Sequence, residues 1–228
     1  MNTTVTAIPL SISTAYLLVG ERPLLVDAGG PGDEDRVRDA LARQGLQPSD
    51  LALVVLTHGH TDHTGVLAML HGAGVPIAVG RGDEELVRRG RNGSLPVTGP
   101  AGLMLLPFVR RTVVEPAEPD IVIEDRLDLR GYGVDAEAER VGGHTPGSLL
   151  VRAGTDVFVG DLVRGGFAAG RIRPGHPLRH FYMEDFASAR RGLETAMHAN
   201  PVQLLPGHGG PLAAADVRRR LNRVAPRR

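Results

Sequence analysis

The stretch Thr57-His58-Gly59-His60-Thr61-Asp62-His63 carries four potential metal ligands within six residues. It directly follows Leu51–Leu56, a continuous apolar run that predicts a strand buried on both faces. A loop after such a strand can aim alternate side chains at one point, so the first two histidines can share a metal ion. Asp62 and the third histidine can then face a second ion. Imidazole nitrogen and carboxylate oxygen are ordinary zinc ligands, so the stretch predicts a metal site.

Further candidate ligands lie in loops that follow other predicted strands. His144 lies in Gly143-His144-Thr145, Asp161 follows the apolar run Val157–Val159, and His208 lies in Pro206-Gly207-His208-Gly209. Asp27 ends a predicted strand at Pro23–Val26 and is followed by Ala28-Gly29-Gly30. We expect Asp27 to orient a ligand or a loop through hydrogen bonds rather than to bind metal itself.

In chain order, these motifs resemble those of the metallo-β-lactamase superfamily, in its glyoxalase II-like branch. His58–His63 resembles the HxHxDH motif, Gly143–Ser148 the GHTPG motif, and Gly160-Asp161 the strand end with a bridging aspartate. The resemblance runs from about Thr4 to Leu212. It implies an α/β (α+β) fold, the αββα four-layer sandwich of two mixed β-sheets flanked by helices. It also places the motif loops along one edge of that sandwich.

The resemblance implies a role for each candidate ligand around two divalent ions, here called metal one and metal two. Zinc is the expected metal, and iron and manganese suit the same ligands. Asp62 and Asp161 would also take part in catalysis. The implied ligands are His58, His60 and His144 for metal one, Asp62, His63 and His208 for metal two, and Asp161 bridging both.

The function implied is metal-dependent hydrolysis of a small-molecule substrate by a hydroxide that bridges the two ions. Several true β-lactamases of the superfamily carry cysteine where Asp161 stands here, which favours a small ester, thioester or lactone over a penicillin-type substrate. The C-terminal pattern that glyoxalase II uses for glutathione is missing. The alternatives are a phosphodiesterase and a mononuclear iron oxidoreductase similar to the persulfide dioxygenases.

Composition narrows the function classes. The 228 residues have a formal net charge of zero, which does not favour a nucleic-acid partner. There is no cysteine, so disulfides and a cysteine nucleophile are excluded. No apolar run approaches the roughly 20 residues of a membrane span. The first 20 residues lack the features of a signal peptide, so we expect a cytoplasmic location, and a homodimer is compatible with the sequence.

We expect a single domain over residues 1–228, with helices at 33–44, from 66, and at 81–91, 184–199 and 213–224. The stretch 81–119 is interpreted as an apolar insertion beside the active site, or else an ordinary core segment. Residues between Asp161 and the helix at 184 are expected to form an arginine-rich loop. The arginines at 164, 171, 173 and 179 are candidates for binding a phosphate or carboxylate. For His176, His180 and Tyr182 we expect structural roles, with substrate contact as the alternative.

Overall fold

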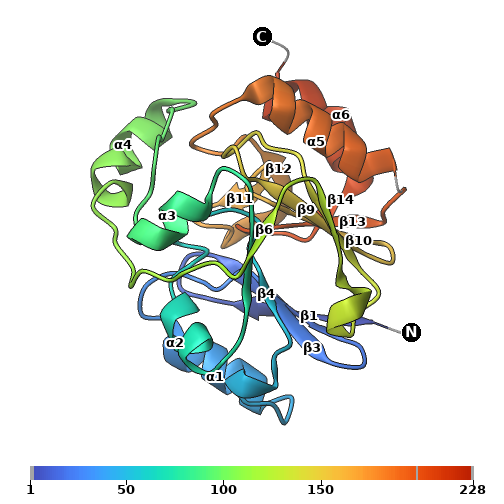
Figure 1. Cartoon of the computed structure of the whole chain (residues 1–228). Coiled ribbons are helices and arrows are strands. Elements are labelled where there is room, and N and C mark those ends of the chain that lie inside the picture. The colour runs from blue at the N-terminus through green and yellow to red at the C-terminus, as the bar shows by residue number, and fades with distance from the viewer. Residues whose placement is uncertain (1–2, 199, 227–228) are drawn as a thin grey trace.

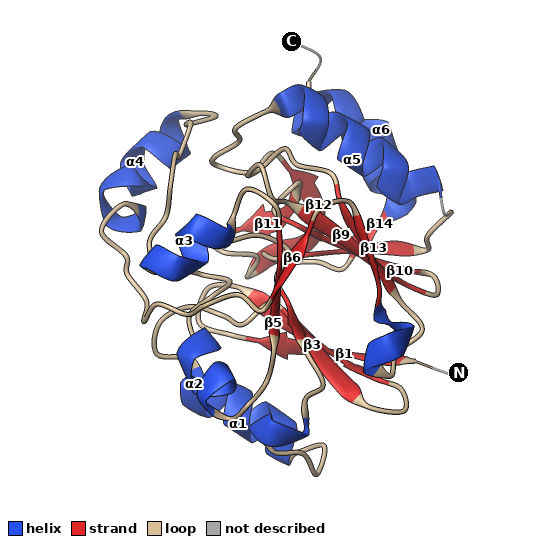
Figure 2. Ribbon diagram, in the orientation of Figure 1, coloured by secondary structure: helices blue, strands red, loops and turns tan. Residues whose placement is uncertain are grey.

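The computed structural model describes residues 3–198 and 200–226. Within this part of the chain, two six-stranded sheets face each other, and helices cover the outer side of each (Figures 1 and 2). The helices α1 and α2 lie against the first sheet, and α5 and α6 lie against the second. The arrangement is therefore the four-layer αββα sandwich.

The first sheet is mixed. Its first three strands pair antiparallel and its last three join in parallel, which suits their continuous apolar sequences. In spatial order it contains β1 (Thr4–Pro9), β2 (Thr14–Val19), β3 (Pro23–Val26), β4 (Val54–Val55), β5 (Ile77–Gly80) and β6 (Ile121–Ile123).

The second sheet is also mixed, because β10 pairs parallel with β13 while its other pairs are antiparallel. In spatial order it contains β14 (Leu212–Ala213), β13 (Gln203–Pro206), β10 (Asp156–Gly160), β9 (Leu149–Ala153), β8 (Glu137–Arg140) and β7 (Arg126–Asp128). A separate antiparallel hairpin is formed by β11 (Arg164–Phe167) and β12 (Ile172–Leu178).

Three of the helices bury an apolar face against a sheet. In α1, α5 and α6, apolar residues at helical spacing face a sheet, as the sequence periodicity predicts. The bounds are α1 (Glu34–Ala42), α2 (Leu67–Gly72), α3 (Glu84–Arg89), α4 (Pro100–Val109), α5 (Phe186–His198) and α6 (Ala214–Val224), with short 3₁₀ helices at Pro48–Asp50 and Leu129–Tyr132.

Alternation along each strand divides the core into three layers. In β3, Leu25 packs in the cluster that also contains Leu41 of α1, whereas Leu24 and Val26 belong to the cluster between the two sheets. Phe158 of β10 belongs to that central cluster and is fully buried. A third cluster joins the outer face of the second sheet to α5 and α6. Because successive side chains of a strand point to opposite faces, both faces of each sheet are packed.

Most element boundaries differ from the sequence prediction by a few residues. All of Leu51–Leu56 is buried as expected, but only Val54–Val55 forms ladder pairs. The helix predicted from 184 begins at Phe186, because the Asp185 carboxylate accepts the Ala187 amide and the Ser188 hydroxyl at the helix start. Ala199, the predicted last residue of that helix, lies outside the described residues.

The arginine-rich loop predicted after Asp161 is wrong, because this stretch forms the β11–β12 hairpin. Its register shifts between Gly165 and Phe167, and Ala168 and Ala169 both adopt left-handed backbone conformations in the turn. The sequence signal of a hairpin is a short turn between alternating strands, and alanines in this conformation do not provide it. The hairpin carries the chain back toward the edge where Asp161 lies.

The stretch 81–119 contains α3 and α4, and α4 lies at one side of the molecule in Figure 1. Pro107 lies inside α4, which continues to Val109. Proline removes one helical hydrogen bond, here to the carbonyl of Leu103, whose side chain is exposed. None of the helices in the described ranges is long and apolar enough to cross a membrane.

Candidate metal centre

All seven predicted ligands lie together in loops at one edge of the sandwich. The structure gathers them in two groups whose donor atoms lie within 4.8 Å of one another. The first group comes from the loop after β4 and the loop between β8 and β9, and the second adds residues after β10 and β13. The groups are His58, His60 and His144, and Asp62, His63, Asp161 and His208.

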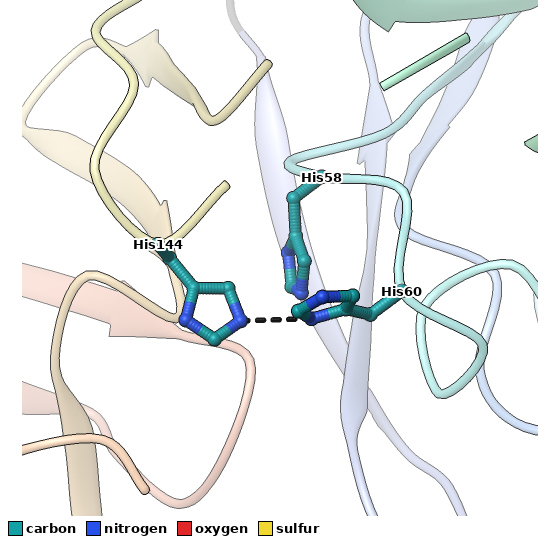
Figure 3. Close-up of side chains that lie close together, drawn as sticks. All are labelled: His58, His60 and His144. Atoms are coloured by element: carbon teal, nitrogen blue, oxygen red, sulfur yellow. Dashed lines mark hydrogen bonds between the residues drawn. The ribbon is translucent and has the colours of Figure 1, made fainter. Parts of the chain in front are cut away.

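The first group is compact and buried. The Nδ1 atom of His60 and the Nε2 atom of His144 face each other at 2.9 Å, and the ring of His58 is edge-on to both (Figure 3). Each ring is at most 5% exposed. Three imidazoles thus converge from two loops that are 84 residues apart in the sequence.

Asp161 connects the two groups. Its Oδ2 atom lies 3.2 Å from Nε2 of His208 and 3.6 Å from Nε2 of His63. The same oxygen lies 3.7 Å from Nε2 of both His58 and His144. The position of Asp161 is therefore suitable for a carboxylate shared between two ions.

The donor separations fit metal coordination. Two ligands of one ion at about 2.1 Å each can be at most about 4.2 Å apart. In the second group, the separations between the histidine Nε2 atoms and the aspartate Oδ2 atoms range from 3.2 to 4.0 Å. The buried Nε2 atoms of His58 and His63, with Oδ1 of Asp161, have no hydrogen-bond partner. Buried polar atoms are almost always paired, so these atoms fit a bound cation.

Hydrogen bonds to Asp27 orient the second group, as the sequence predicts. Its Oδ2 atom lies 2.9 Å from Nδ1 of His63, which directs Nε2 of that ring toward Asp161. The same carboxylate accepts the amide and hydroxyl hydrogens of Thr57 at 2.7 and 2.8 Å. Asp27 itself has a φ of 63°, a strained conformation that these bonds hold.

Backbone carbonyls orient two more of the imidazoles. Nδ1 of His144 donates to the carbonyl oxygen of Tyr182 at 3.0 Å, and Nδ1 of His208 donates to that of Ile12 at 2.8 Å. With Nδ1 donating there, Nε2 of each ring is directed into the site, where its lone pair can bind a metal ion once that nitrogen carries no proton. Such contacts typically fix metal-binding histidines.

The imidazoles of the first group are held neutral. Burial lowers the pKa of His60 to about 4, and burial together with the neighbouring histidines lowers the pKa values of His58 and His144 well below the usual range. A neutral imidazole has the lone pair that a metal needs. This group is therefore prepared for a cation at neutral pH.

The second group has the opposite balance. Burial lowers the pKa of His208, but attraction to Asp161 and Asp62 outweighs burial and raises it to about 10. Attraction to Asp27 similarly raises the pKa of His63 above its usual range against the effect of burial. Burial raises the pKa of Asp161, but attraction to the histidines outweighs it and keeps the carboxylate ionised. Positive charge is therefore favoured within the second group of ligands.

Asp83, which no sequence motif identifies, connects the two histidine loops. Its carboxylate accepts the amides of Gly59 at 2.8 Å and Gly147 at 2.9 Å, and the hydroxyl of Thr145 at 2.6 Å. Burial outweighs these bonds and raises its pKa. In the sequence, Gly82-Asp83 resembles an ordinary helix start, so only the fold reveals this role.

The structural role expected for His180 also needs correction. Nε2 of His180 lies 3.1 Å from Oδ2 of Asp161, and its ring packs against those of His144 and His208. Tyr182 does have structural contacts, because its hydroxyl donates to the carbonyl of Gly102. His176, by contrast, lies beside Phe167 on the hairpin.

A mostly apolar cavity of about 330 Å³ opens onto the site. Arg164 also lines it, with its guanidinium 4.1 Å from the centre of the Phe181 ring. Among the described residues, no carboxylate pairs with Arg164, whose Nε and Nη1 atoms donate to backbone carbonyls. The other lining side chains include Ile12, Leu95, Leu105, Val109, Tyr182, and the site residues His60, Asp62, Asp161, His180 and His208.

Gly207 approaches the centre so closely that no side chain fits. A Cβ atom there would lie 2.3 Å from His63 and 2.6 Å from Asp161. Only glycine fits at position 207, so the backbone can pass close to the centre there and place His208 at the site.

Known proteins are similar to this chain in sequence or in fold. Metallo-beta-lactamase domain-containing protein 1 of Rattus norvegicus is 48% identical over 56 residues, which cover 25% of this chain and 22% of that protein. A probable metallo-hydrolase of Methanocaldococcus jannaschii is 28% identical over 203 residues, covering 86% of this chain and 87% of that protein.

The fold is similar to that of a metallo-beta-lactamase family protein from Thermus thermophilus. The TM-score is 0.65 at 20% sequence identity, over 97% of this chain and 77% of that one. The model of the metallo-beta-lactamase superfamily matches residues 8–208. The chain therefore belongs to the metallo-beta-lactamase superfamily.

Proposed function

We propose that this protein is a hydrolase that holds two divalent metal ions, most simply zinc, and cleaves a small ester, thioester or lactone. The observation that carries the proposal is the pair of donor groups joined by Asp161 at the floor of an apolar cavity. His58, His60 and His144 would hold metal one, and Asp62, His63 and His208 would hold metal two.

When bound, the two ions would ionise a shared water near neutral pH and polarise the carbonyl of the substrate. The chain's own groups hold and orient the reactants. Asp161 would fix the spacing between the ions. The side chain of Asp62 is 24% exposed and lines the cavity, so it can accept a hydrogen bond from the attacking water.

The cavity supports a substrate with an apolar acyl group. Its volume is at the lower end of the range for small-molecule sites, and Leu105 and Val109 of α4 contribute to its wall. Arg164 is a half-buried cation on the same wall, and it can bind a carboxylate on the substrate. An apolar ester, thioester or lactone that carries a carboxylate therefore suits the site best.

The test is acid release from a substrate panel in weak buffer with an indicator dye. The panel contains a thioester, a lactone, an aryl ester, a phosphodiester and a β-lactam. Each is offered to zinc-loaded and metal-free protein. We expect metal-dependent acid release from the thioester, lactone or aryl ester. Acid release from the phosphodiester alone would favour the phosphodiesterase alternative. No acid release from any substrate would contradict hydrolysis of these classes.

A matched pair of variants tests the substrate's charge. For substrates that carry a carboxylate, Arg164→Gln should raise KM on the order of tenfold, the effect of about 1.4 kcal/mol. Arg179→Gln is the control, because that guanidinium also donates to a backbone carbonyl and lies over a phenylalanine ring, but does not line the cavity. Equal effects of the two variants would contradict the role of Arg164.

A further inference from the structure

We propose that His180 is a further metal ligand, which binds metal one through its Nε2 atom beside His144 and Asp161. The inference rests on the proposed function, because it concerns the same metal centre. The three residues form a third group of potential ligands, with donor atoms within 4.8 Å of one another. His180 belongs to neither of the ligand sets that the motifs predict.

The position of Nε2 matches that of a ligand. It lies 3.1 Å from Oδ2 of Asp161, slightly closer than Nε2 of His208 at 3.2 Å. Two ligands at right angles around one ion, each about 2.1 Å from it, are about 3.0 Å apart. The His180 ring is 6% exposed, and its centre is 4.5 Å from that of His144.

The loop that carries His180 is held in place from the side of α4. The Thr98 hydroxyl donates to the carbonyl of His180 at 2.5 Å, and the Thr98 amide donates to that of Phe181 at 2.9 Å. The Met183 amide donates to the carbonyl of Pro96 at 3.0 Å. The stretch before α4 thus fixes the histidine in the site, as preorganised ligands require.

The Tyr182 peptide provides the orienting contact. Its carbonyl oxygen lies 3.2 Å from Nδ1 of His180 and 3.0 Å from Nδ1 of His144. When Nδ1 of His180 donates there, Nε2 has a lone pair directed at the site. In the rival tautomer, Nδ1 accepts the Tyr182 amide at 3.3 Å, and Nε2 only donates a hydrogen bond to Asp161.

A fifth protein ligand has a consequence for the choice of metal. His58, His60, His144, Asp161 and His180 exceed the tetrahedral set that zinc usually takes in proteins. The site of metal one could then hold, besides zinc, ions that accept five or six ligands, such as manganese or iron.

Zinc affinity at both sites can be measured by competition with a chromophoric chelator. The proteins are wild type, His180→Ala, His180→Gln and the control His176→Ala. Glutamine keeps a hydrogen-bond donor near the position of Nε2 but is a poor zinc ligand. We expect both His180 variants to lose more than about 100-fold in affinity at one site, beyond the 10–100-fold typical of a lost outer hydrogen bond. His176→Ala should match wild type.

A smaller loss in either His180 variant, or recovery in the glutamine variant, would overturn the assignment. A second measurement needs no folded variant: the wild-type protein loaded with ¹¹³Cd should show a one-bond ¹¹³Cd–¹⁵N coupling at Nε2 of His180, and its absence would also overturn the proposal. Wild-type protein that binds no metal would instead contradict the proposed function. Wild-type protein that binds two ions but shows no ¹¹³Cd–¹⁵N coupling at His180 would contradict this inference alone.

Discussion

Asp83 provides the sharpest test of how the fold supports the site. Asp83→Ala removes the acceptor for the amides of Gly59 and Gly147 and the hydroxyl of Thr145. The hydroxyl keeps a partner in Ser148 at 3.0 Å, so two buried amides lose theirs. Each such loss destabilises by about 1–3 kcal/mol, which gives about 2–6 kcal/mol in total.

The assay is denaturant unfolding of the metal-free protein, followed by zinc titration. In a chain of this length, the centre of that range lowers Tm by about 12 °C. Asp83→Asn should lose about half as much stability, because its amide oxygen can accept only one of the two amides. Zinc affinity should fall by about 10–100-fold, because Gly59 and Gly147 belong to the two histidine loops.

Asp128→Asn is the exposed control, and its effect on the free energy of unfolding should be smaller than that of either Asp83 variant. An Asp83→Ala variant that unfolds with the same free energy as wild type would refute the stabilising role of these buried hydrogen bonds. If stability falls while zinc affinity stays unchanged, Asp83 supports the fold but does not position the metal ligands.

Three further predictions concern charge, metal binding and the core. His63 and His208 have raised pKa values and are protonated at pH 7 before metal binds, so zinc should release on the order of two protons per chain. Calorimetry in buffers of different ionisation enthalpy should detect this proton release. As pH rises through about 10, the number of protons released should fall and zinc affinity should increase. Proton release that is independent of pH would contradict these pKa shifts. Asp161→Ala should bind at most one ion by elemental analysis, and two ions with full activity would exclude the bridging role. Phe158→Ala should lose about 3–5 kcal/mol of stability in denaturant, whereas Phe108→Ala, at a side chain 73% exposed, should change it by no more than about 0.5 kcal/mol; equal losses would contradict the layered core.

The layers and the motif residues could be predicted because their signals are local. Buried strands such as Leu51–Leu56 are continuous apolar runs, and the ligands of the His58–His63 stretch lie within a few residues of one another. Loops at the ends of neighbouring strands meet at one edge, so the convergence of His144 and His208 follows from the strand order.

His180 and Asp83 could not be predicted because their roles depend on contacts between distant segments. His180 reaches the site only through the β11–β12 hairpin, whose turn uses left-handed alanines, and through Thr98, 82 residues away. Asp83 bonds to residues 24 and 64 positions away. α4 was obscured by Pro107 and by apolar residues on all its faces, which remove the helical period.

The binuclear hydrolase requires two metal ions per chain, held between the two groups of ligands. They can be counted by elemental analysis of protein equilibrated with zinc, iron and manganese and then freed of excess metal. We expect two ions per chain. A single iron per chain would contradict the binuclear hydrolase and favour the mononuclear oxidoreductase, and protein without metal would contradict the metal centre itself.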